Sequence, residues 1–306
     1  MKIGIDLGGT KTEIAAFDAR GAELLRRREP TPSGNYAATL ALLAKLVADA
    51  ERELATTATV GIGTPGALSP STGLMRNSNS TCLNLQPLKI DVQRVLGRKV
   101  RLANDANCFA LSEATDGAAA GAASVFGVIL GTGVGGGIVI NGCLLDGPNA
   151  IAGEWGHNPL PWPEDDERPG APCYCGQRGC IETFLSGPGL ARDHARVHGA
   201  SFSAEEIVAR CASDDAAEHT LARYENRLAR ALASVINMLD PEVIVLGGGL
   251  SNIERLYKNI PALWGKWVFS DTVRTRLVRN VHGDSSGVRG AARRGCGPKR
   301  ELWIPK

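Results

Sequence analysis

The chain of 306 residues is long enough for one large domain or two smaller ones, and its 43% hydrophobic and 22% charged residues are typical of a globular protein. The formal net charge of +2 is nearly balanced, so we interpret the short basic runs, Arg26–Arg28 and Arg293–Arg294, as solvated faces and expect no nucleic-acid partner. The sequence shows neither a signal-peptide pattern nor a run of roughly 18 apolar residues, which predicts a cytoplasmic protein with no membrane partner.

The N-terminal part of the chain alternates between strand and helix patterns. An apolar run at 3–7 ends at two glycines and apolar residues resume at 13–18, which predicts a strand, a tight turn and a second strand. Leucines recur at helical spacing over 36–54, which predicts an amphipathic helix. The elements expected further on are strands at 59–62 and 100–103 and an alanine-rich helix from about 106 to 116.

The C-terminal part opens on the same pattern. Apolar residues at 125–130 lead into the glycine-rich turn 131–137, and β-branched residues follow at 138–140. A glycine hairpin therefore opens each half of the chain, which indicates a duplicated α/β domain with a cleft between two similar halves. The elements expected further on are a helix over 218–238, a strand at 243–246 and a last helix that begins near Ser286.

The glycine turns have the composition of a phosphate-binding site. Gly131-x-Gly133-x-x-Gly136 matches the dinucleotide fingerprint, but a strand follows it where that fold needs a helix, which argues against an NAD-dependent dehydrogenase. A bare glycine backbone can instead donate N–H groups to phosphate oxygens, so the hairpins at 6–11 and 131–137 could hold a nucleotide tail; tight turns without a ligand are the alternative. The glycine run 247–249 follows a strand and fits a backbone packed against adenine and ribose.

The combined motifs resemble the ROK family (repressors, open reading frames and kinases). The residues that carry the resemblance are Asp6-Leu7-Gly8-Gly9-Thr10-Lys11, Asn104-Asp105-Ala106-Asn107, Gly131-Thr132-Gly133, Gly153-Glu154-Trp155-Gly156-His157 and the segment from Cys173 to Glu182. The resemblance runs from Ile3 to about Ala292 and implies the actin-like ATPase (ribonuclease H-like) α/β fold, with two similar lobes, a central cleft and a homodimeric assembly. It implies an N-terminal lobe at 1–116, with a C-terminal helix at about 286–298 packed back on it, and a C-terminal lobe at 117–285 that carries the zinc segment.

Within the family the chain looks most like bacterial fructokinases of the manno(fructo)kinase type, on the segments His157–Trp162 and His282–Gly290. The resemblance thus implies a cytoplasmic transferase of carbohydrate metabolism that phosphorylates a free hexose with ATP, D-fructose to fructose 6-phosphate first. Mannose, glucose or an N-acetylhexosamine are the alternatives. Similar fructokinases tend to carry an aromatic residue where this chain has Cys82, so its sugar preference could differ.

Three cysteines and a histidine have the composition of a zinc site. His157, Cys173, Cys175 and Cys180 offer one nitrogen and three sulfurs, which suits a closed tetrahedral ion, with buried thiols and an unrelated histidine as the alternative. Disulfides are not expected among the eight cysteines in a reducing compartment, and we assign most of the other five to core packing. The resemblance makes the zinc structural and implies that it fixes Glu154 and Glu182 toward the sugar.

The resemblance also assigns the reaction to particular residues. Asp105 is the general base for the attacking hydroxyl, and a helix N-cap is its alternative interpretation. The sugar-binding residues are expected to be Gly63, Thr64, Asn79, Asn104, Asp105, Glu154, His157 and Glu182, with His157 shared between zinc and sugar. The residues expected to bind ATP are Asp6, Gly8, Gly9, Thr10, Lys11, Gly131, Thr132, Gly133, Gly247, Gly248 and Gly249, and Mg²⁺ would arrive with ATP and lie near Asp6.

Other classes of protein fit the sequence less well. A DNA-binding repressor of the same family would need a winged-helix domain before the first strand, where this sequence starts directly on that strand. A non-catalytic sugar sensor would need neither Asp105 nor both glycine hairpins, and a chaperone-type ATPase of the same fold would not need the zinc segment. We therefore expect an enzyme whose partner is a small-molecule hexose.

Overall fold

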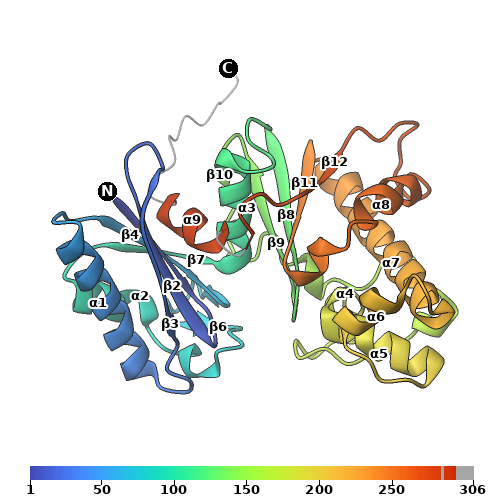
Figure 1. The fold of residues 1–306 in the computed structure, drawn as a ribbon, viewed down its shortest axis with the longest axis horizontal. Coiled ribbons are helices and arrows are strands. Elements are labelled where there is room, and N and C mark those ends of the chain that lie inside the picture. The colour runs from blue at the N-terminus through green and yellow to red at the C-terminus, as the bar shows by residue number, and fades with distance from the viewer. Residues whose placement is uncertain (284–285, 294–306) are drawn as a thin grey trace. The chain divides into compact units, whose positions relative to one another are not determined.

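The computed structural model describes residues 1–283 and 286–293, which form two compact units (Figure 1). Unit 1 comprises Met1–Ser112, Cys143–Ala152 and the described residues from Ser286 on. Unit 2 comprises Glu113–Gly142 and the described residues from Gly153 on to Gly283. The described residues do not include Asp284, Ser285 or the tail from Arg294 on. The last part of the predicted C-terminal helix, 294–298, and Cys296 therefore lie outside them.

Unit 1 is built on a mixed sheet whose strands are β1 (Lys2–Leu7), β2 (Lys11–Phe17), β3 (Glu23–Pro30), β4 (Thr59–Thr64) and β7 (Val100–Asn104). The order is β3-β2-β1-β4-β7, with β1 antiparallel to β2 and parallel to β4. The central strands are almost wholly buried, as their apolar runs predict. A separate two-stranded sheet consists of β5 (Ala67–Leu68) and β6 (Met75–Arg76).

The first helix of unit 1 begins at a polar cap and buries one face. Asn35 accepts a hydrogen bond from the Ala38 N–H and starts the first helix one residue further on, and buried Leu43 and Leu46 lie on its inner face. The helical elements are α1 (Tyr36–Glu53), η1 (Thr81–Leu83), α2 (Leu88–Leu96), α3 (Asp105–Asp116), whose last residues belong to unit 2, and α9 (Ser286–Arg293).

Helix α9 packs directly on the backbone of the unit 1 sheet because three positions carry no side chain. A Cβ atom at Gly4 would lie 1.9 Å from the Val288 carbonyl oxygen, and one at Gly61 would lie 2.0 Å from the Ala291 carbonyl oxygen. Within α9 itself, a Cβ atom at Gly290 would lie 1.8 Å from a carbonyl oxygen of α3. The C-terminal helix therefore completes the core formed by the N-terminal strands.

Unit 2 repeats this arrangement in a sheet of β8 (Ser124–Leu130), β9 (Val134–Ile140), β11 (Val243–Gly247) and β12 (Arg276–Arg279), and β10 (Cys143–Leu144), whose residues are counted with unit 1, pairs with β9 at the edge of this sheet. The order β10-β9-β8-β11-β12 matches the order in unit 1, with an antiparallel hairpin beside two parallel strands. The predicted duplication is thus confirmed. So is the strand after the glycine-rich turn, which excludes the dinucleotide-binding fold at that turn.

The helices of unit 2 include the long α7, which begins where Asp214 accepts hydrogen bonds from the Ala216 and Ala217 N–H groups. The helical elements are η2 (Trp155–His157), η3 (Asp165–Glu167), α4 (Glu182–Leu185), α5 (Gly187–His198), α6 (Ala204–Arg210), α7 (Asp215–Leu239), η4 (Gly249–Asn252) and α8 (Leu256–Trp264). Among the described residues, none of the helices is both long and apolar enough to cross a membrane.

The basic run Arg26–Arg28 lies on β3, a strand that the sequence pattern did not reveal. Arg26 donates a 2.5 Å hydrogen bond to the buried carboxylate of Glu13, and Arg28 pairs with the same carboxylate. Arg27 pairs with Glu53 on α1. These arginines are therefore bound within unit 1, and their side chains hold an edge strand onto the sheet.

Candidate active site and metal centre

The predicted site residues of unit 1 gather where three parallel strands end. Asp6 on β1 is in register with Gly63 on β4, and Thr64 is in register with Asn104 on β7. The carboxyl ends of parallel strands share one edge, which is where ligands bind in sheets of this kind. Thr64 is buried and its hydroxyl donates to the Ala103 carbonyl at 3.3 Å, so this side chain is bound inside the sheet.

Asp105 is the first residue of α3, directly after β7. The Asn104 side-chain oxygen accepts a 2.9 Å hydrogen bond from the Ala106 N–H, so the capping position before the helix is held by Asn104. The Asp105 carboxylate accepts from the same N–H at 2.8 Å. Although solvent reaches Asp105, the surrounding protein removes enough water to raise the pKa of its carboxyl, and hydrogen bonds from the backbone and Asn104 oppose that shift.

The β1–β2 hairpin presents an exposed tip at Gly9, Thr10 and Lys11. The turn closes through a 3.0 Å hydrogen bond from the Gly8 N–H to the Lys11 carbonyl. A Cβ atom at Gly8 would lie 2.7 Å from that carbonyl oxygen, so the tight turn itself requires this glycine. The tip leaves a cation and backbone groups open to solvent, as a phosphate-binding loop needs.

The loop that carries Asn79 is held together by a neighbouring amide. Asn84 accepts from the Ser78 N–H and donates to the Ser78 carbonyl, both at 2.9 Å. Asn79 is exposed. Cys82 is half-buried against the apolar core of unit 1.

In unit 2, two of the predicted nucleotide-binding segments lie at one edge of the sheet. The β8–β9 turn closes through a 3.0 Å hydrogen bond from the Gly131 N–H to the Gly133 carbonyl, with Thr132 exposed. The end of β11 runs beside it, because Gly247 is in register with Ile129. Gly248 has a φ of 80°, and a Cβ atom there would lie 2.4 Å from the Leu130 carbonyl oxygen, so only glycine fits this approach.

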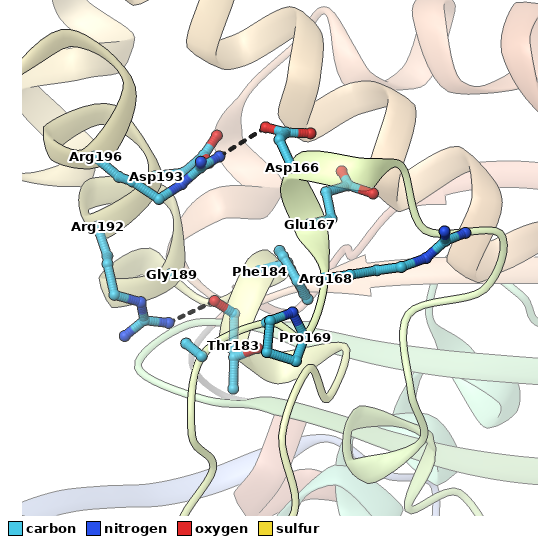
Figure 2. A pocket seen from close by; sticks show the side chains of 12 residues that line it. Asp166, Glu167, Arg168, Pro169, Thr183, Phe184, Gly189, Arg192, Asp193 and Arg196 are labelled. Carbon is cyan, nitrogen blue, oxygen red and sulfur yellow. Dashed lines mark hydrogen bonds and ion pairs between the residues drawn. The ribbon is translucent and has the colours of Figure 1, made fainter.

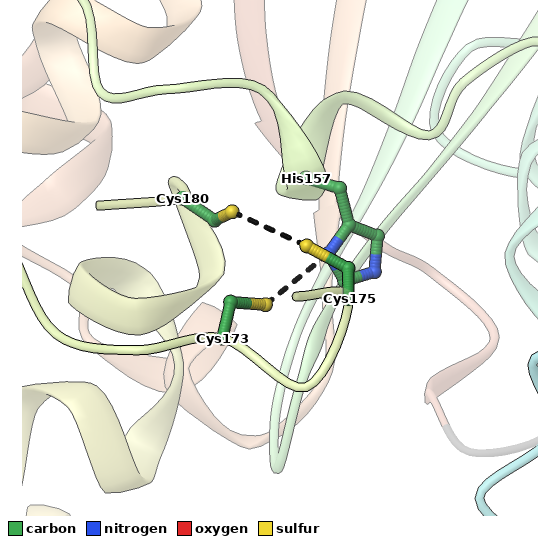
Figure 3. A group of neighbouring side chains, drawn as sticks. All are labelled: His157, Cys173, Cys175 and Cys180. Carbon is green, nitrogen blue, oxygen red and sulfur yellow. Dashed lines mark hydrogen bonds between the residues drawn. The ribbon is translucent and has the colours of Figure 1, made fainter. Parts of the chain in front are cut away.

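The four predicted metal ligands come together in unit 2 (Figure 3). Their ligand atoms lie within 4.8 Å of one another, with Cys173 Sγ 3.5 Å from His157 Nδ1 and Cys175 Sγ 3.6 Å from Cys180 Sγ. A tetrahedral zinc ion with bonds of about 2.3 Å to sulfur and about 2.0 Å to nitrogen separates two sulfurs by about 3.8 Å, and sulfur from nitrogen by about 3.5 Å. The cluster therefore fits zinc, and four protein ligands complete its coordination without a substrate.

The other nitrogen of His157 meets a residue that the sequence interpretation missed. Nε2 lies 2.9 Å from the hydroxyl of Tyr174, which stands between two of the cysteine ligands. Loss of water around this hydroxyl, together with the negative charges of Glu182 and Glu154, raises the pKa of Tyr174 to about 12. With zinc on Nδ1, the Nε2–H of His157 donates to the Tyr174 hydroxyl. This hydroxyl therefore competes with the sugar for the Nε2–H that was expected to bind it. The position of Tyr174 within the cysteine motif was the signal available in the sequence.

The two predicted sugar-binding carboxylates of unit 2 differ in their surroundings. Glu154 is exposed just before η2. Glu182 opens α4, and its Oε2 accepts a 2.9 Å hydrogen bond from the Val134 N–H at the start of β9. One oxygen of Glu182 is therefore already bound to the glycine hairpin.

A cavity of about 270 Å³ lies between residues 166–171, α4 and α5 (Figure 2). Behind it, the buried Arg227 of α7 donates to Glu167 at 2.7 Å and to Asp193 at 2.6 Å. Burial alone would raise the pKa of Asp193, but hydrogen bonds and charge from Arg227 and Arg223 outweigh it and hold that pKa well below its usual range. This ion-pair network anchors the segment that leads to the zinc ligands.

Two mixed five-stranded sheets of the same order, each with a glycine hairpin, define the two-lobe actin-like ATPase fold, and unit 2 also carries the His-Cys₃ cluster that fits zinc. The model of one family, described as the ROK family, matches residues 2–293, and the chain belongs to that family. The resemblance that the motifs indicated is thereby confirmed at the level of the family.

Comparisons with individual proteins extend over nearly the whole chain. The N-acetyl-D-glucosamine kinase of Pectobacterium atrosepticum is 40% identical over 297 residues, which cover 95% of this chain and 98% of that protein. A ROK hexokinase structure from Thermus thermophilus superimposes with a TM-score of 0.85 at 32% identity, covering 95% of this chain and 97% of that one. A ROK glucokinase from Streptomyces griseus, solved with glucose and AMPPNP, gives a TM-score of 0.76 at 27% identity, with coverages of 95% and 98%.

These comparisons support the kinase expectation better than the choice of sugar. The curated relative named above is an N-acetyl-D-glucosamine kinase, and another from Vibrio vulnificus is 39% identical over 297 residues, 95% of this chain and 98% of that protein. The expectation of a fructokinase is not supported by them. Of the sugars weighed on the sequence, the N-acetylhexosamine alternative is favoured.

Proposed function

We propose that the protein transfers the γ-phosphoryl group of ATP to N-acetyl-D-glucosamine. The observation that carries the proposal is the 39–40% identity, across 95% of this chain, to relatives that are N-acetyl-D-glucosamine kinases. The solvent-reached carboxylate of Asp105 at a strand end supplies the group that such a reaction requires.

In the proposed reaction, Asp105 accepts the proton of the attacking sugar hydroxyl. A bond forms between the hydroxyl oxygen and the γ-phosphorus, the bond from that phosphorus to the bridging oxygen breaks, and ADP leaves with the electron pair. The raised pKa of Asp105 makes its ionised form a stronger base than an ordinary carboxylate.

The nucleotide contacts in this proposal come from the two glycine hairpins. The exposed tip Gly9–Lys11 and the turn Gly131–Gly133 offer backbone N–H groups and one lysine to the phosphates, and Gly247–Gly249 lies beside the second turn for the nucleoside. Mg²⁺ bound to ATP would neutralise phosphate charge. The half-buried carboxylate of Asp6 at the end of β1 is the oxygen donor that suits it.

The sugar contacts expected from the sequence fall into two groups. Asn104, Asp105, Gly63 and the exposed Asn79 belong to unit 1, and Glu154, His157 and Glu182 belong to unit 2. Because the Thr64 hydroxyl, both polar atoms of the Asn104 side chain and one Glu182 oxygen are bound within their own units, we assign most of the direct recognition to the exposed carboxylates of Asp105 and Glu154. Zinc on His157, Cys173, Cys175 and Cys180 would keep the second group in place.

A coupled ADP-release assay with Mg-ATP tests the proposal against N-acetyl-D-glucosamine, glucose, mannose and fructose, with Asp105→Asn as the control. The highest kcat/KM is expected for N-acetyl-D-glucosamine, with the control nearly inactive. A higher kcat/KM for another hexose would correct the substrate and leave the kinase assignment standing. If none of these sugars raises ADP release in folded, zinc-loaded protein, the kinase proposal for them is refuted. Light scattering would test the homodimer that the family resemblance predicts.

A further inference from the structure

The glycine hairpin of unit 2 is bound on one side by the segment that follows the zinc ligand Cys180. Glu182, two residues after this cysteine, accepts the 2.9 Å hydrogen bond from the Val134 N–H. Gly187 then donates its N–H to the Gly131 carbonyl at 2.8 Å. Both ends of the turn are therefore hydrogen-bonded to the chain that leaves the metal cluster.

On the other side, the hairpin packs against the segment that ends at the ligand His157. The Trp155 indole N–H donates to the Gly135 carbonyl at 3.1 Å. Backbones approach so closely here that a Cβ atom at Gly156 would lie 2.3 Å from the Val134 carbonyl oxygen, and one at Gly136 would lie 2.6 Å from the Gly153 carbonyl oxygen. The second contact set is thus made of close packing as well as a hydrogen bond.

The metal cluster joins these two segments, since His157 ends one and Cys180 begins the other. Backbone hydrogen bonds of 2.9 Å, donated by Leu160 to Gly179 and by Ile181 to Asn158, also link them. A bound ion adds four bonds at one point of this junction, and metal sites of this type stabilise the conformation of the chain that binds them. Loss of zinc would therefore loosen both segments at once and leave the hairpin with weaker supports.

We propose that the zinc centre positions the Gly131–Gly136 hairpin, with Glu182 as the positioning residue that transmits its effect. Glycine at 133 serves this contact, because a Cβ atom there would lie 2.7 Å from Glu182 Oε2. The role of the hairpin in holding nucleotide rests on the proposed function; its support by the metal centre rests on the contacts within unit 2 alone.

Hydrogen–deuterium exchange of the full chain without substrates tests the positioning directly. Zinc-loaded protein is compared with chelator-treated protein, in which the exposed Cys175 gives the chelator access, and with Glu182→Ala, which keeps all four ligands. Peptides that cover 128–137 should exchange about three- to tenfold faster in both cases, the effect of losing one or two supporting hydrogen bonds. Glu182→Gln retains an acceptor and should stay close to wild type, and Glu205→Ala, an exposed carboxylate on α6, is the matched control.

Two results would overturn the inference. One is that chelation accelerates exchange only within 157–182, and the other is that Glu182→Ala with a full zinc content leaves peptides 128–137 unchanged. Titration with Mg-AMPPNP separates this test from the proposed function. A Kd that is weaker for Glu182→Ala and not for the other two variants links the hairpin to nucleotide binding. Wild type that binds no nucleotide refutes the proposed function, while the exchange data still decide the positioning role.

Discussion

Gly61→Ala tests whether α9 owes its position to the absent side chains beneath it. The new Cβ atom would lie 2.0 Å from the Ala291 carbonyl oxygen, whereas ordinary van der Waals contact begins at 3.4 Å. Helix α9 would have to retreat by roughly 1.4 Å, the difference between these distances, or the strand would have to bend. Such overpacking costs about 1–3 kcal/mol, equivalent to about 2–12 °C in Tm for a unit of this size.

Scanning calorimetry measures this loss, and Gly265→Ala is the matched control. Gly265 has an ordinary helical φ and no heavy atom within 4 Å of the added Cβ, so the control should stay within about 1 °C of wild type. The N-terminal turn of α9 lies close to Asp6, since a Cβ atom at Gly287 would be 2.8 Å from Asp6 Oδ2. A shift of α9 would therefore disturb Asp6, and Gly61→Ala should also lower kcat. Equal Tm values for the two variants would refute the packing argument.

Three further predictions follow from the charged groups. Asp105→Asn should lower kcat by about 10²–10⁴-fold. Folding raises the pKa of Asp105, so above the unfolded pKa of about 3.9 the ionised carboxylate lowers the stability of the wild type. Calorimetry should therefore find Asp105→Asn at least as stable as wild type at pH 7. Any gain in stability should be gone below about pH 4. Arg227→Met leaves Asp193 and Glu167 with fewer partners and should cost about 3–5 kcal/mol in urea unfolding, whereas Arg168→Met, which breaks an exposed pair, should change it by less than about 1 kcal/mol. Folding lowers the pKa values of Asp193 and Glu167, so the stability that these two carboxylates contribute is present above their unfolded pKa values of about 4 and should fall as the pH drops further. Urea titrations at pH 7 and pH 3 measure this loss. A constant free energy of unfolding over that range would contradict the assignment.

The parts of the fold that depend on local pattern were predictable from the sequence. The strand after the glycine-rich turn follows from the β-branched residues of 138–140, and α1 follows from its leucine spacing. The metal cluster was equally accessible, because three of its ligands lie within eight residues, from Cys173 to Cys180, and only one histidine had to be added. Each of these inferences needed information from a short stretch of chain.

The parts that depend on distant contacts were not predictable in the same way. Gly4 and Gly61 are ordinary strand glycines in the sequence. A side chain is excluded at both positions by α9, which begins at Ser286, more than two hundred residues further along the chain. Strand β3 was missed because only Leu25 among its residues is buried, so its pattern is that of a charged surface segment. Its arginines find Glu13 and Glu53 on two other elements, which no local pattern records.

The choice of fructose from the sequence rested on two segments, and one of them makes structural contacts. Residues 157–162 served as the marker of substrate, yet the carbonyls of Pro161 and Trp162 accept hydrogen bonds from the buried Arg230 at 3.3 and 2.5 Å. Trp162 has a φ of 47°, a strained conformation that its hydrogen bond from Arg230 helps to maintain. At the other end of this segment, His157 directs Nδ1 toward the cysteine ligands. Similarity over these residues therefore reports how the zinc segment is anchored to α7. Under the proposed function, the choice of sugar would depend instead on side chains outside this anchor, such as the exposed Glu154.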